Sequence, residues 1–432
     1  MTYFWIFVIL FFSAIAFYTK TIPNKFDPRR LIFWVFLVFV VIPSFLILVV
    51  NISPFLFIDN IESTFVQVIL FFMVFLATSE LLARIRPIRA DLLRVNLNDK
   101  VYIIAAVCMG ISILAKIYLY QKGLFFIEDE NDKSLVKIPA YIDYFKNIYL
   151  FGLLFLVTYA LRKWCELNLI QKGTIVVYVL TVVSIEFAQG RRTGAVLPFA
   201  MIFTLWAIEN RVKISSLFIL GISGIVIFMA TTIYRINQVL FISDDGGGLA
   251  SSLFSNMDSS MLKTYFETFF AGALSRVGNP VIMVDRLITQ APTLGPVPFD
   301  SFPLVVQALI PRMFYPSKPS LSIGNEYGRY IGEIAPTNYE VGINPGWIAE
   351  GFVQNFSLSG VAIAAILFSF CSMLSYKICD PKTDLGKVLL WQMTIFLFSG
   401  FQLEIAFTVN NLVKGVLLNV FLFQLIAYFS RK

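Results

Sequence analysis

Runs of about twenty apolar residues recur from one end of the chain to the other, and they limit the possible folds more than any other feature. Apolar residues make up 58% of the 432 residues and charged residues 14%, against about 45–50% and about 25% in soluble domains. We therefore predict an all-α polytopic membrane protein with about eleven transmembrane helices. The expected spans are 2–18, 31–50, 64–83, 101–120, 144–161, 174–188, 195–208, 214–234, 358–376, 388–406 and 412–429.

The chain is expected to divide into three parts in sequence order. Residues 1–234 form an eight-span bundle, 235–357 form one long extracytoplasmic loop, and 358–432 form a three-span bundle. The loop is expected to be partly helical, because Leu262, Phe266 and Phe269 recur at helical spacing and Asn279-Pro280 can begin another helix. We interpret these segments as amphipathic helices at the outer membrane face.

Lysine and arginine residues gather in alternate loops, and this pattern predicts the orientation of the chain. Residues 20–30, 84–100, 162–172, 211–213 and 377–387 are rich in them, whereas 51–63 contains none. Because cytoplasmic loops are enriched in Lys and Arg, we expect the N-terminus outside and the C-terminus in the cytoplasm. The same bias accounts for the net charge of +7, so no nucleic-acid partner is expected.

The absence of histidine limits the chemistry that the chain can perform. Histidine is the commonest general base and metal ligand, and the four cysteines (Cys108, Cys165, Cys371 and Cys379) lack the paired spacing of metal ligands. We expect no metal and no cofactor. A general base would therefore have to be a carboxylate.

Ionisable residues also occur in or beside the expected spans, where they are costly and often functional. They are Lys116, Glu186, Arg235, Glu404 and Lys414. All are expected within one or two helical turns of the outer interface, at 1.5 Å per residue. The alternative is that these side chains extend to the lipid headgroups without a further role.

The turn Gly190-Arg191-Arg192-Thr193-Gly194 places two arginines outside, against the orientation bias. Its glycines allow close approach of a ligand, and the following span begins with free backbone N–H groups. Paired guanidinium groups suit phosphate. We therefore expect Arg191 and Arg192 to bind an anion. The long loop adds further cations, Arg276, Arg286, Arg312, Lys318 and Arg329, any of which can instead be paired with an acid.

Several motifs of the long loop resemble a known family. They are Ile310-Pro311-Arg312, Pro316-Ser317-Lys318-Pro319, Gly324-Asn325-Glu326-Tyr327-Gly328 and Asn344-Pro345-Gly346-Trp347-Ile348-Ala349-Glu350-Gly351-Phe352. With the arginine turn and the overall topology, the chain resembles the O-antigen polymerases, the Wzy-type polymerases of oligosaccharide repeat units.

This resemblance implies a GT-C-like glycosyltransferase of the bacterial inner membrane that needs neither metal nor nucleotide sugar. Such an enzyme transfers an undecaprenyl-pyrophosphate-linked glycan chain to a lipid-linked repeat unit on the periplasmic side. A chain-length regulator and a flippase of the same pathway would be its partners. The substrate-binding residues would be Arg191, Arg192, Arg276, Arg312, Lys318, Arg329 and Lys414.

Glu350 is our first choice for the general base, because it follows Pro345-Gly346 at the point where the loop returns to the membrane. Glu326, Glu333, Glu186 and Glu404 are alternatives. A structural role for Glu350, such as capping a helix or pairing with an arginine, stays open.

Two rival functions share the predicted topology. The O-antigen ligases resemble one another in using an external histidine, which this chain lacks. A flippase or other transporter of lipid-linked oligosaccharide would be expected to show structural repeats and charged sites near the bilayer midplane. No repeat is evident, and the charges are expected at the outer level. A scaffolding role would leave the arginine turn unexplained.

Overall fold

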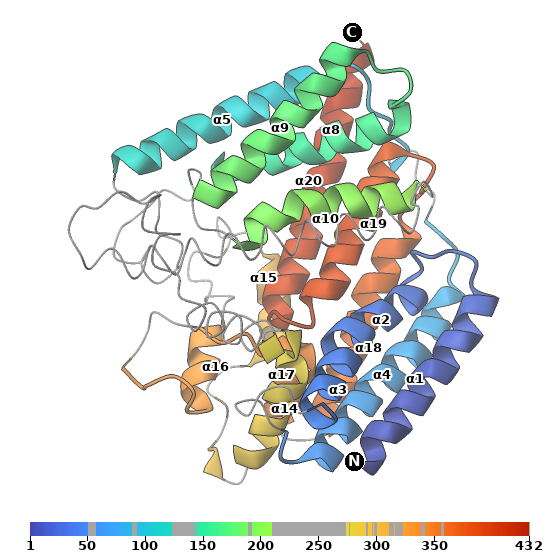
Figure 1. Ribbon diagram of the computed structural model, residues 1–432, viewed down its shortest axis with the longest axis vertical. Coiled ribbons are helices and arrows are strands. Elements are labelled where there is room, and N and C mark those ends of the chain that lie inside the picture. The colour runs from blue at the N-terminus through green and yellow to red at the C-terminus, as the bar shows by residue number, and fades with distance from the viewer. Residues whose placement is uncertain are drawn as a thin grey trace. The chain divides into compact units, whose positions relative to one another are not determined.

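The computed structural model describes residues 1–50, 58–88, 93–122, 142, 145–188, 192–209, 274–275, 277–290, 293–295, 297, 300–310, 315, 323–337, 342–355 and 358–431. These residues form helices joined by turns, with no strand among them (Figure 1). The chain forms two compact units, which are described separately. Unit 1 comprises 1–90, 267–379 and 392–419, and unit 2 comprises 91–266, 380–391 and 420–432. The three-part division along the sequence stays a prediction.

The N-terminal part of unit 1 is a bundle of long helices. They are α1 (Thr2–Thr21), the continuous stretch α2 (Pro28–Phe36), η1 (Leu37–Val41) and α3 (Ile42–Leu48), then α4 (Ile61–Ala83) and α18 (Leu358–Lys377). Asp27 caps α2 by accepting the N–H of Arg29 at 3.0 Å, ahead of Pro28 at the first helical position. The π-helical turn η1 precedes Pro43, which has no N–H to continue the ladder.

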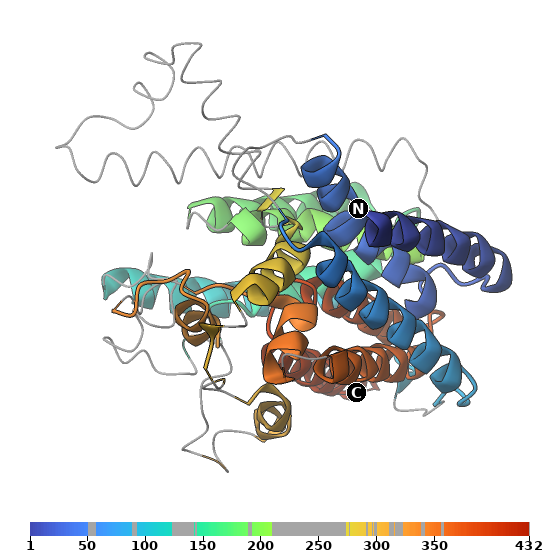
Figure 2. The same ribbon diagram turned by 90° about the horizontal axis from the view of Figure 1, so that it is seen from below.

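Aromatic side chains fill the interior of this bundle. Phe7 of α1 packs against Phe65 and Phe72 of α4, with ring centroids 5.9 Å apart in each pair. On the other side of α4, Phe71 packs against Phe368 of α18 at 5.8 Å. Consequently α4 lies between α1 and α18 (Figures 1 and 2).

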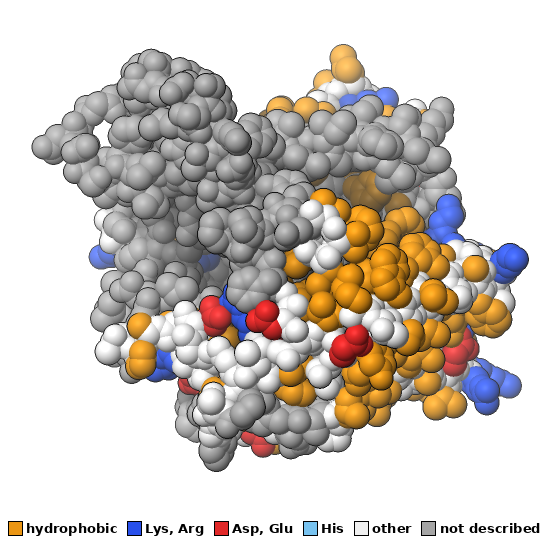
Figure 3. Space-filling view, turned by 60° about the horizontal axis from the view of Figure 1, so that its bottom comes forward, with side chains coloured by type: hydrophobic (Ala, Val, Ile, Leu, Met, Phe, Trp, Pro, Cys, Tyr) orange, Lys and Arg blue, Asp and Glu red, His pale blue; other side chains and the backbone are white. Residues whose placement is uncertain are grey.

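The outward face of these helices is also apolar. Trp5, Ile9, Phe12 and Phe17 on α1 are exposed, and Figure 3 shows a broad area of exposed apolar side chains. A helix that is apolar on every side is stable only when lipid or protein surrounds it. The structure therefore supports the prediction of a membrane-embedded helical protein.

Seven helices of the described part are long and apolar enough to cross a membrane: Thr2–Thr21, Pro28–Leu48, Ile61–Ala83, Val101–Gln121, Leu169–Glu186, Leu358–Lys377 and Ile405–Tyr428. Each overlaps an expected span. Three further expected spans correspond to shorter helices, and the span at 214–234 lies outside the described residues. The count of eleven stays a prediction.

Unit 2 is built from α5 (Val101–Gln121), α8 (Tyr149–Lys163), α9 (Leu169–Ala188) and α10 (Arg192–Ile208), with the beginning of α19 (Asp384–Ser399) and the end of α20 (Ile405–Arg431). Gly152 allows α8 to pack closely on α9, because an added Cβ would lie 2.3 Å from the Tyr178 hydroxyl. That hydroxyl donates to the carbonyl oxygen of Tyr149 at 2.9 Å.

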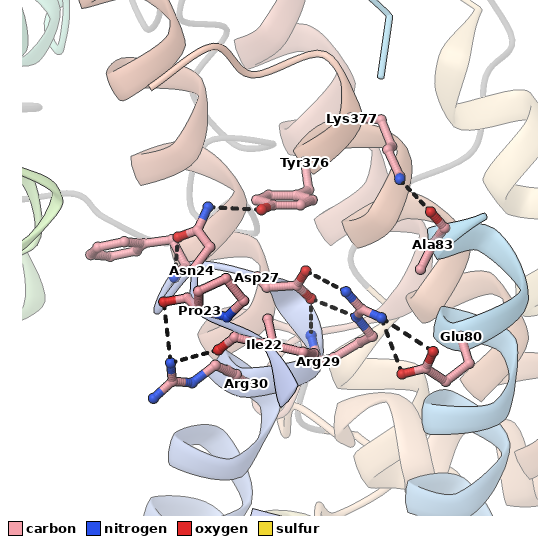
Figure 4. A network of polar contacts seen from close by, with 11 residues as sticks. Ile22, Pro23, Asn24, Asp27, Arg29, Arg30, Glu80, Ala83, Tyr376 and Lys377 are labelled. Carbon is pink, nitrogen blue, oxygen red and sulfur yellow. Dashed lines mark hydrogen bonds and ion pairs between the residues drawn. The ribbon is translucent and has the colours of Figure 1, made fainter. Parts of the chain in front are cut away.

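Polar contacts in unit 1 join segments that loop charge predicts to lie on one side of the membrane (Figure 4). Arg29 binds Asp27 at 2.8 Å and Glu80 at 3.1 Å. Lys377 donates to the carbonyl oxygen of Ala83 at 2.7 Å, and Asn24 donates to the Tyr376 hydroxyl at 2.7 Å. All of these residues belong to the predicted cytoplasmic side.

The opposite end of unit 1 joins segments predicted to be external. The N-terminal ammonium binds Glu62 at 2.7 Å. Asp285 of α14 (Asn279–Gln290) accepts the N–H groups of Asp59 at 2.9 Å and Asn60 at 2.6 Å, at the start of α4. The loops rich in Lys and Arg therefore meet at one end of unit 1, and the loops predicted to be external meet at the other. Which end is cytoplasmic stays a prediction.

Both helices near the C-terminus begin earlier than expected, and α19 also ends earlier. The expected spans 388–406 and 412–429 are observed as α19 (Asp384–Ser399) and α20 (Ile405–Arg431). Asn410 and Asn411 lie between the two expected spans, but both residues are helical and Asn410 is buried. Glu404 consequently precedes a helix, and Lys414 is the tenth residue of α20 rather than the third of a span that begins at 412.

Candidate functional site

The candidate site of unit 1 is built around α17 (Gly346–Asn355), a ten-residue helix too short to cross a membrane. It runs antiparallel to α18. Trp347 at its beginning packs against Phe368, near the middle of α18, with ring centroids 4.7 Å apart and the rings tilted by 56°. One turn further on, an added Cβ on Gly351 would lie 2.8 Å from the Cβ of Ala364, nearer the start of α18. The last segment of the long loop therefore folds back along the first half of α18.

The connection between α19 and α20 reaches the same depth in the bundle. Phe401 packs against Phe36, Phe71 and Phe368, with centroids 4.9–5.9 Å apart. Each of these three rings lies near the middle of a helix long enough to cross a membrane. The sequence placed Glu404 near the outer end of a span. Its position three residues after Phe401 instead puts it in an irregular connection at mid-depth in unit 1.

Three contacts hold α17 on this connection and on the first turn of α20. The N–H of Trp347 donates to the carbonyl oxygen of Gly400 at 3.1 Å, and its indole Nε1 donates to Thr408 Oγ1 at 2.8 Å. Gly346 has a φ of +71°, and an added Cβ would lie 2.5 Å from the carbonyl oxygen of Phe401. Irregular backbone at membrane depth is tolerated where protein buries it, and these bonds satisfy part of it.

Glu350 is the centre of this arrangement. Its side chain is 0% exposed, and Oε2 accepts the N–H of Ile405 at 2.7 Å, which caps the beginning of α20. Oε1 has no hydrogen-bond partner among the described residues. Burial raises the pKa of Glu350 to about 8. At neutral pH the carboxyl therefore carries a proton most of the time, and it can exchange that proton near physiological pH.

Two neighbouring groups act on Glu350 from different elements. Ser301, at the start of α15 (Ser301–Leu309), lowers the pKa of Glu350, and Glu404 raises it by charge repulsion. Glu404 is 2% exposed. Its Oε1 lies against Gly324, where an added Cβ would be 3.1 Å away, so a side chain at this position would crowd the carboxylate.

Tyr327 of α16 (Gly324–Tyr330) borders the same carboxyl and is fully buried. Burial, reinforced by the nearby charge of Glu350, holds the pKa of its phenol well above the ordinary value. Arg286 lowers that pKa, and Arg286 forms an ion pair with Glu333 at 2.6 Å. Glu333, an alternative for the general base, is therefore paired with an arginine.

The predicted site residues are distributed as follows. Glu350 and Glu404 come together. Arg329 lies half-buried on α16, Glu326 is exposed on the same helix, and Lys414 is exposed on α20. Arg192 begins α10 in unit 2, with its side chain outside the described part. Arg191, Arg276, Arg312 and Lys318 lie outside the described residues.

Sequence reasoning missed Ser301 and Tyr327 as neighbours of the site and treated Arg286 only as one cation of the loop. Tyr327 stands in a motif noted for its resemblance, but nothing in the sequence indicates that it lies near Glu350. Gly346 could have been recognised, because glycine after proline and before an apolar helix suggests a positive φ.

Unit 2 contains a second buried polar group. Lys116 of α5 and Glu186 of α9, predicted as separate charges at the outer ends of their spans, form an ion pair at 4.0 Å. Their side chains are 5% and 4% exposed. The ammonium group of Lys116 also lies 5.1 Å from the ring centroid of Tyr149. Glu186 therefore has a charge partner, which makes it a weaker candidate for a general base.

Comparison of the chain with family models, with curated proteins and with solved structures finds no match.

Proposed function

We propose that the protein is a membrane glycosyltransferase that polymerises polyprenyl-pyrophosphate-linked oligosaccharide repeat units. The observation that carries the proposal is the carboxyl of Glu350, which is fully buried and keeps one oxygen without a hydrogen-bond partner among the described residues. Burial raises the pKa of this carboxyl to about 8. A pKa close to the working pH suits a general base. The resemblance of the surrounding motifs to O-antigen polymerases supplies the substrate class.

The reaction requires one proton acceptor and a stabilised leaving group. A hydroxyl of the acceptor sugar attacks the anomeric carbon of the donor chain and forms the new C–O bond. The bond from that carbon to the pyrophosphate oxygen breaks, and the polyprenyl pyrophosphate leaves with the electron pair. Glu350, once ionised, takes the hydroxyl proton. Fixed cations stabilise the charge that develops on the pyrophosphate, and we assign this role to Arg191, Arg192, Arg276, Arg312, Lys318, Arg329 and Lys414.

The proposal includes a location and partners. The enzyme would lie in the bacterial inner membrane with the N-terminus in the periplasm and the C-terminus in the cytoplasm. It would act with a flippase and a chain-length regulator, and it would use neither metal nor cofactor.

The direct test is polymerisation by purified protein in lipid nanodiscs supplied with a lipid-linked repeat unit. We expect a ladder of products that persists in the presence of a chelator. Glu350→Ala should abolish the ladder, whereas the matched control Glu326→Gln, at an exposed acid of α16, should leave it unchanged. Wild-type protein that binds the substrate without forming any ladder would contradict the proposal.

A transporter of lipid-linked oligosaccharide is the second candidate, and one observation favours it. The half-length helix α17 begins beside a connection at mid-depth in the bundle, and Glu350 and Glu404 are buried at this junction. Interrupted helices with polar groups near the midplane are typical of transporter sites. Deleting the gene in a host that makes a known polysaccharide separates the functions. Loss of a polymerase leaves single repeats attached to lipid A core, loss of a ligase leaves none attached, and loss of a flippase retains repeats on the cytoplasmic side.

A further inference from the structure

Two hydrogen bonds join α17 to the first turn of α20, and they lie about one turn apart on both helices. The indole Nε1 of Trp347 donates to Thr408 Oγ1 at 2.8 Å. One turn further along α17, Glu350 Oε2 accepts the N–H of Ile405 at 2.7 Å, and Ile405 lies one turn before Thr408 in α20. All four residues belong to unit 1 and are buried.

The hydroxyl of Thr408 connects these two hydrogen bonds. Because Thr408 Oγ1 accepts the indole N–H of Trp347, its own proton is directed to carbonyl oxygens of α20, that of Glu404 at 2.9 Å and that of Ile405 at 3.0 Å. The carbonyl of Glu404 and the N–H of Ile405 are the two ends of one peptide group. The hydrogen bonds therefore all run in one direction, from the indole through the hydroxyl and this peptide group to the carboxyl of Glu350.

This common direction strengthens the last hydrogen bond. A carbonyl that accepts hydrogen bonds polarises its peptide group, so the N–H at the other end becomes a stronger donor. The indole of Trp347 is itself fixed, because it is fully buried and packs against Phe368 and Phe396 with ring centroids 4.7 Å and 5.7 Å apart. A reactive group keeps its geometry when packing and further hydrogen bonds hold it in this way.

The bond from Ile405 also distinguishes the two oxygens of the Glu350 carboxyl. A neutral carboxyl has one O–H donor and one carbonyl acceptor. Since Oε2 accepts the backbone N–H, it is the carbonyl oxygen, and the proton lies on Oε1. Oε1 has no hydrogen-bond partner among the described residues. Once the carboxyl is ionised, Oε1 is therefore the oxygen that can accept the proton of an incoming hydroxyl group.

We infer that Trp347 and Thr408 are positioning residues that orient the carboxyl of Glu350 through the peptide group between Glu404 and Ile405, with Oε1 as the oxygen that exchanges the proton. The consequence for polymerisation rests on the proposed function. The orientation of the carboxyl does not, and it can be measured without substrate.

The first experiment is infrared spectroscopy of the purified protein at about pH 6, where the raised pKa of Glu350 keeps its carboxyl protonated. The C=O stretch of this carboxyl is identified by its loss in Glu350→Gln. Thr408→Val keeps the shape of the side chain but removes the hydroxyl, so the bond to Oε2 should weaken and the stretch should move to higher wavenumber. Thr408→Ser keeps the hydroxyl and should resemble wild type.

Trp347→Phe keeps an aromatic ring but removes the indole N–H, and it tests the same hydrogen bonds from the other end. The stretch should again move to higher wavenumber, which also provides the measurement if Thr408→Val does not fold. Because both substitutions act through one series of bonds, the double variant should show no larger shift than Thr408→Val alone.

Thr158 of α8, in unit 2, provides a matched control. Like Thr408 it is 1% exposed, and its hydroxyl donates to the carbonyl oxygen four residues earlier, that of Leu154, at 2.7 Å. Thr158→Val therefore removes an equally buried hydroxyl and the same kind of bond, but outside the series that ends at Glu350. The stretch of Glu350 should stay at its wild-type position.

The same variants are then compared in polymerisation kinetics. Because a misplaced reactive group slows the chemical step, Thr408→Val should lower kcat by about ten- to a hundredfold with little change in KM, and Thr408→Ser should retain most of the wild-type kcat. A shifted stretch in Thr408→Val without polymerisation by wild type would leave the inference standing and reject the proposed function. An unchanged stretch in Thr408→Val and Trp347→Phe, or an equal shift in Thr158→Val, would overturn the inference.

Discussion

Gly346 and the carbonyl oxygen of Phe401 are in such close contact that a Cβ added to Gly346 would lie 2.5 Å from that oxygen. This contact joins the beginning of α17 to the connection between α19 and α20, which brings Glu350 to the start of α20. The position also has a φ of +71°. Glycine is therefore required both for its backbone conformation and for the space it leaves.

Gly346→Ala is expected to destabilise unit 1 strongly. The positive φ alone costs about 1–2 kcal/mol for an L residue, and the clash with Phe401 adds about 1–3 kcal/mol. Gly332 is a matched control, because it has the same φ of +71° but an added Cβ would meet nothing within 4 Å. Thermal unfolding in detergent should show a larger loss for Gly346→Ala than for Gly332→Ala. Equal losses of stability in the two variants would mean that the close contact with Phe401 does not contribute to stability.

The sequence predicted the helices that cross the bundle better than the connection between the last two. Spans can be recognised because a helix that crosses a bilayer needs about twenty apolar residues, and these residues are consecutive in the sequence. The break at 400–404 was missed because apolar residues lie on both sides of Gly400. What fixes the start of α20 is a hydrogen bond to Glu350, 55 positions earlier in the chain.

The candidate site was likewise predicted only in part. Glu350 was identified from its position after Pro345-Gly346, and a capping role was kept open beside catalysis. Its contact with Ile405 and the influence of Ser301 and Glu404 depend on long-range packing, which a single sequence does not reveal. The pairing of Lys116 with Glu186 also depends on long-range packing, and the sequence identified each of these charges only separately.

The buried pair in unit 2 predicts a specific pattern of stabilities. Lys116→Met or Glu186→Met removes one member of this buried ion pair and should cost about 3–5 kcal/mol, whereas the double substitution should recover most of this loss. Thermal unfolding of the four proteins measures the coupling. Additive losses in the double variant would show that the two charges do not stabilise each other.

Glu350→Gln should change how stability depends on pH. Burial raises the pKa of Glu350 from 4.5 to about 8 in the folded protein. Its contribution to stability is fully present below about pH 4.5 and is lost as the pH rises through about 8. Wild type should therefore lose stability from this carboxyl between pH 5 and 8, by up to about 1.4 kcal/mol per pH unit. Glutamine mimics the neutral carboxyl, so the variant should lack this component. Parallel unfolding curves for the two proteins across this range would contradict the assignment.

The orientation of the chain can be tested by cysteine labelling from outside the cell. In a background without the four native cysteines, Asp245→Cys and Asn325→Cys should react with a membrane-impermeant maleimide. Arg94→Cys and Lys382→Cys should react only after the membrane is opened, because their loops carry the positive charge of the cytoplasmic side. Reversed accessibility would place the long loop in the cytoplasm and contradict the proposed function, which requires this loop on the periplasmic side.

The arginine turn before α10 provides the last prediction. We expect Arg191 and Arg192 to bind the pyrophosphate of a lipid-linked substrate, since the sequence predicts them to be external against the charge bias, Gly190 and Gly194 flank them, and α10 begins at Arg192. A hydrogen bond to a charged group contributes about 1.5–3 kcal/mol, and each ~1.4 kcal/mol is tenfold in rate. Replacing either arginine by alanine should lower polymerisation about tenfold or more at unchanged protein level. Lysine keeps the charge but loses the planar fork, so it should rescue only in part. Long polymer in both alanine variants would show that the turn only helps to orient the chain in the membrane. The anion site would then have to be sought among Arg276, Arg312 and Arg329.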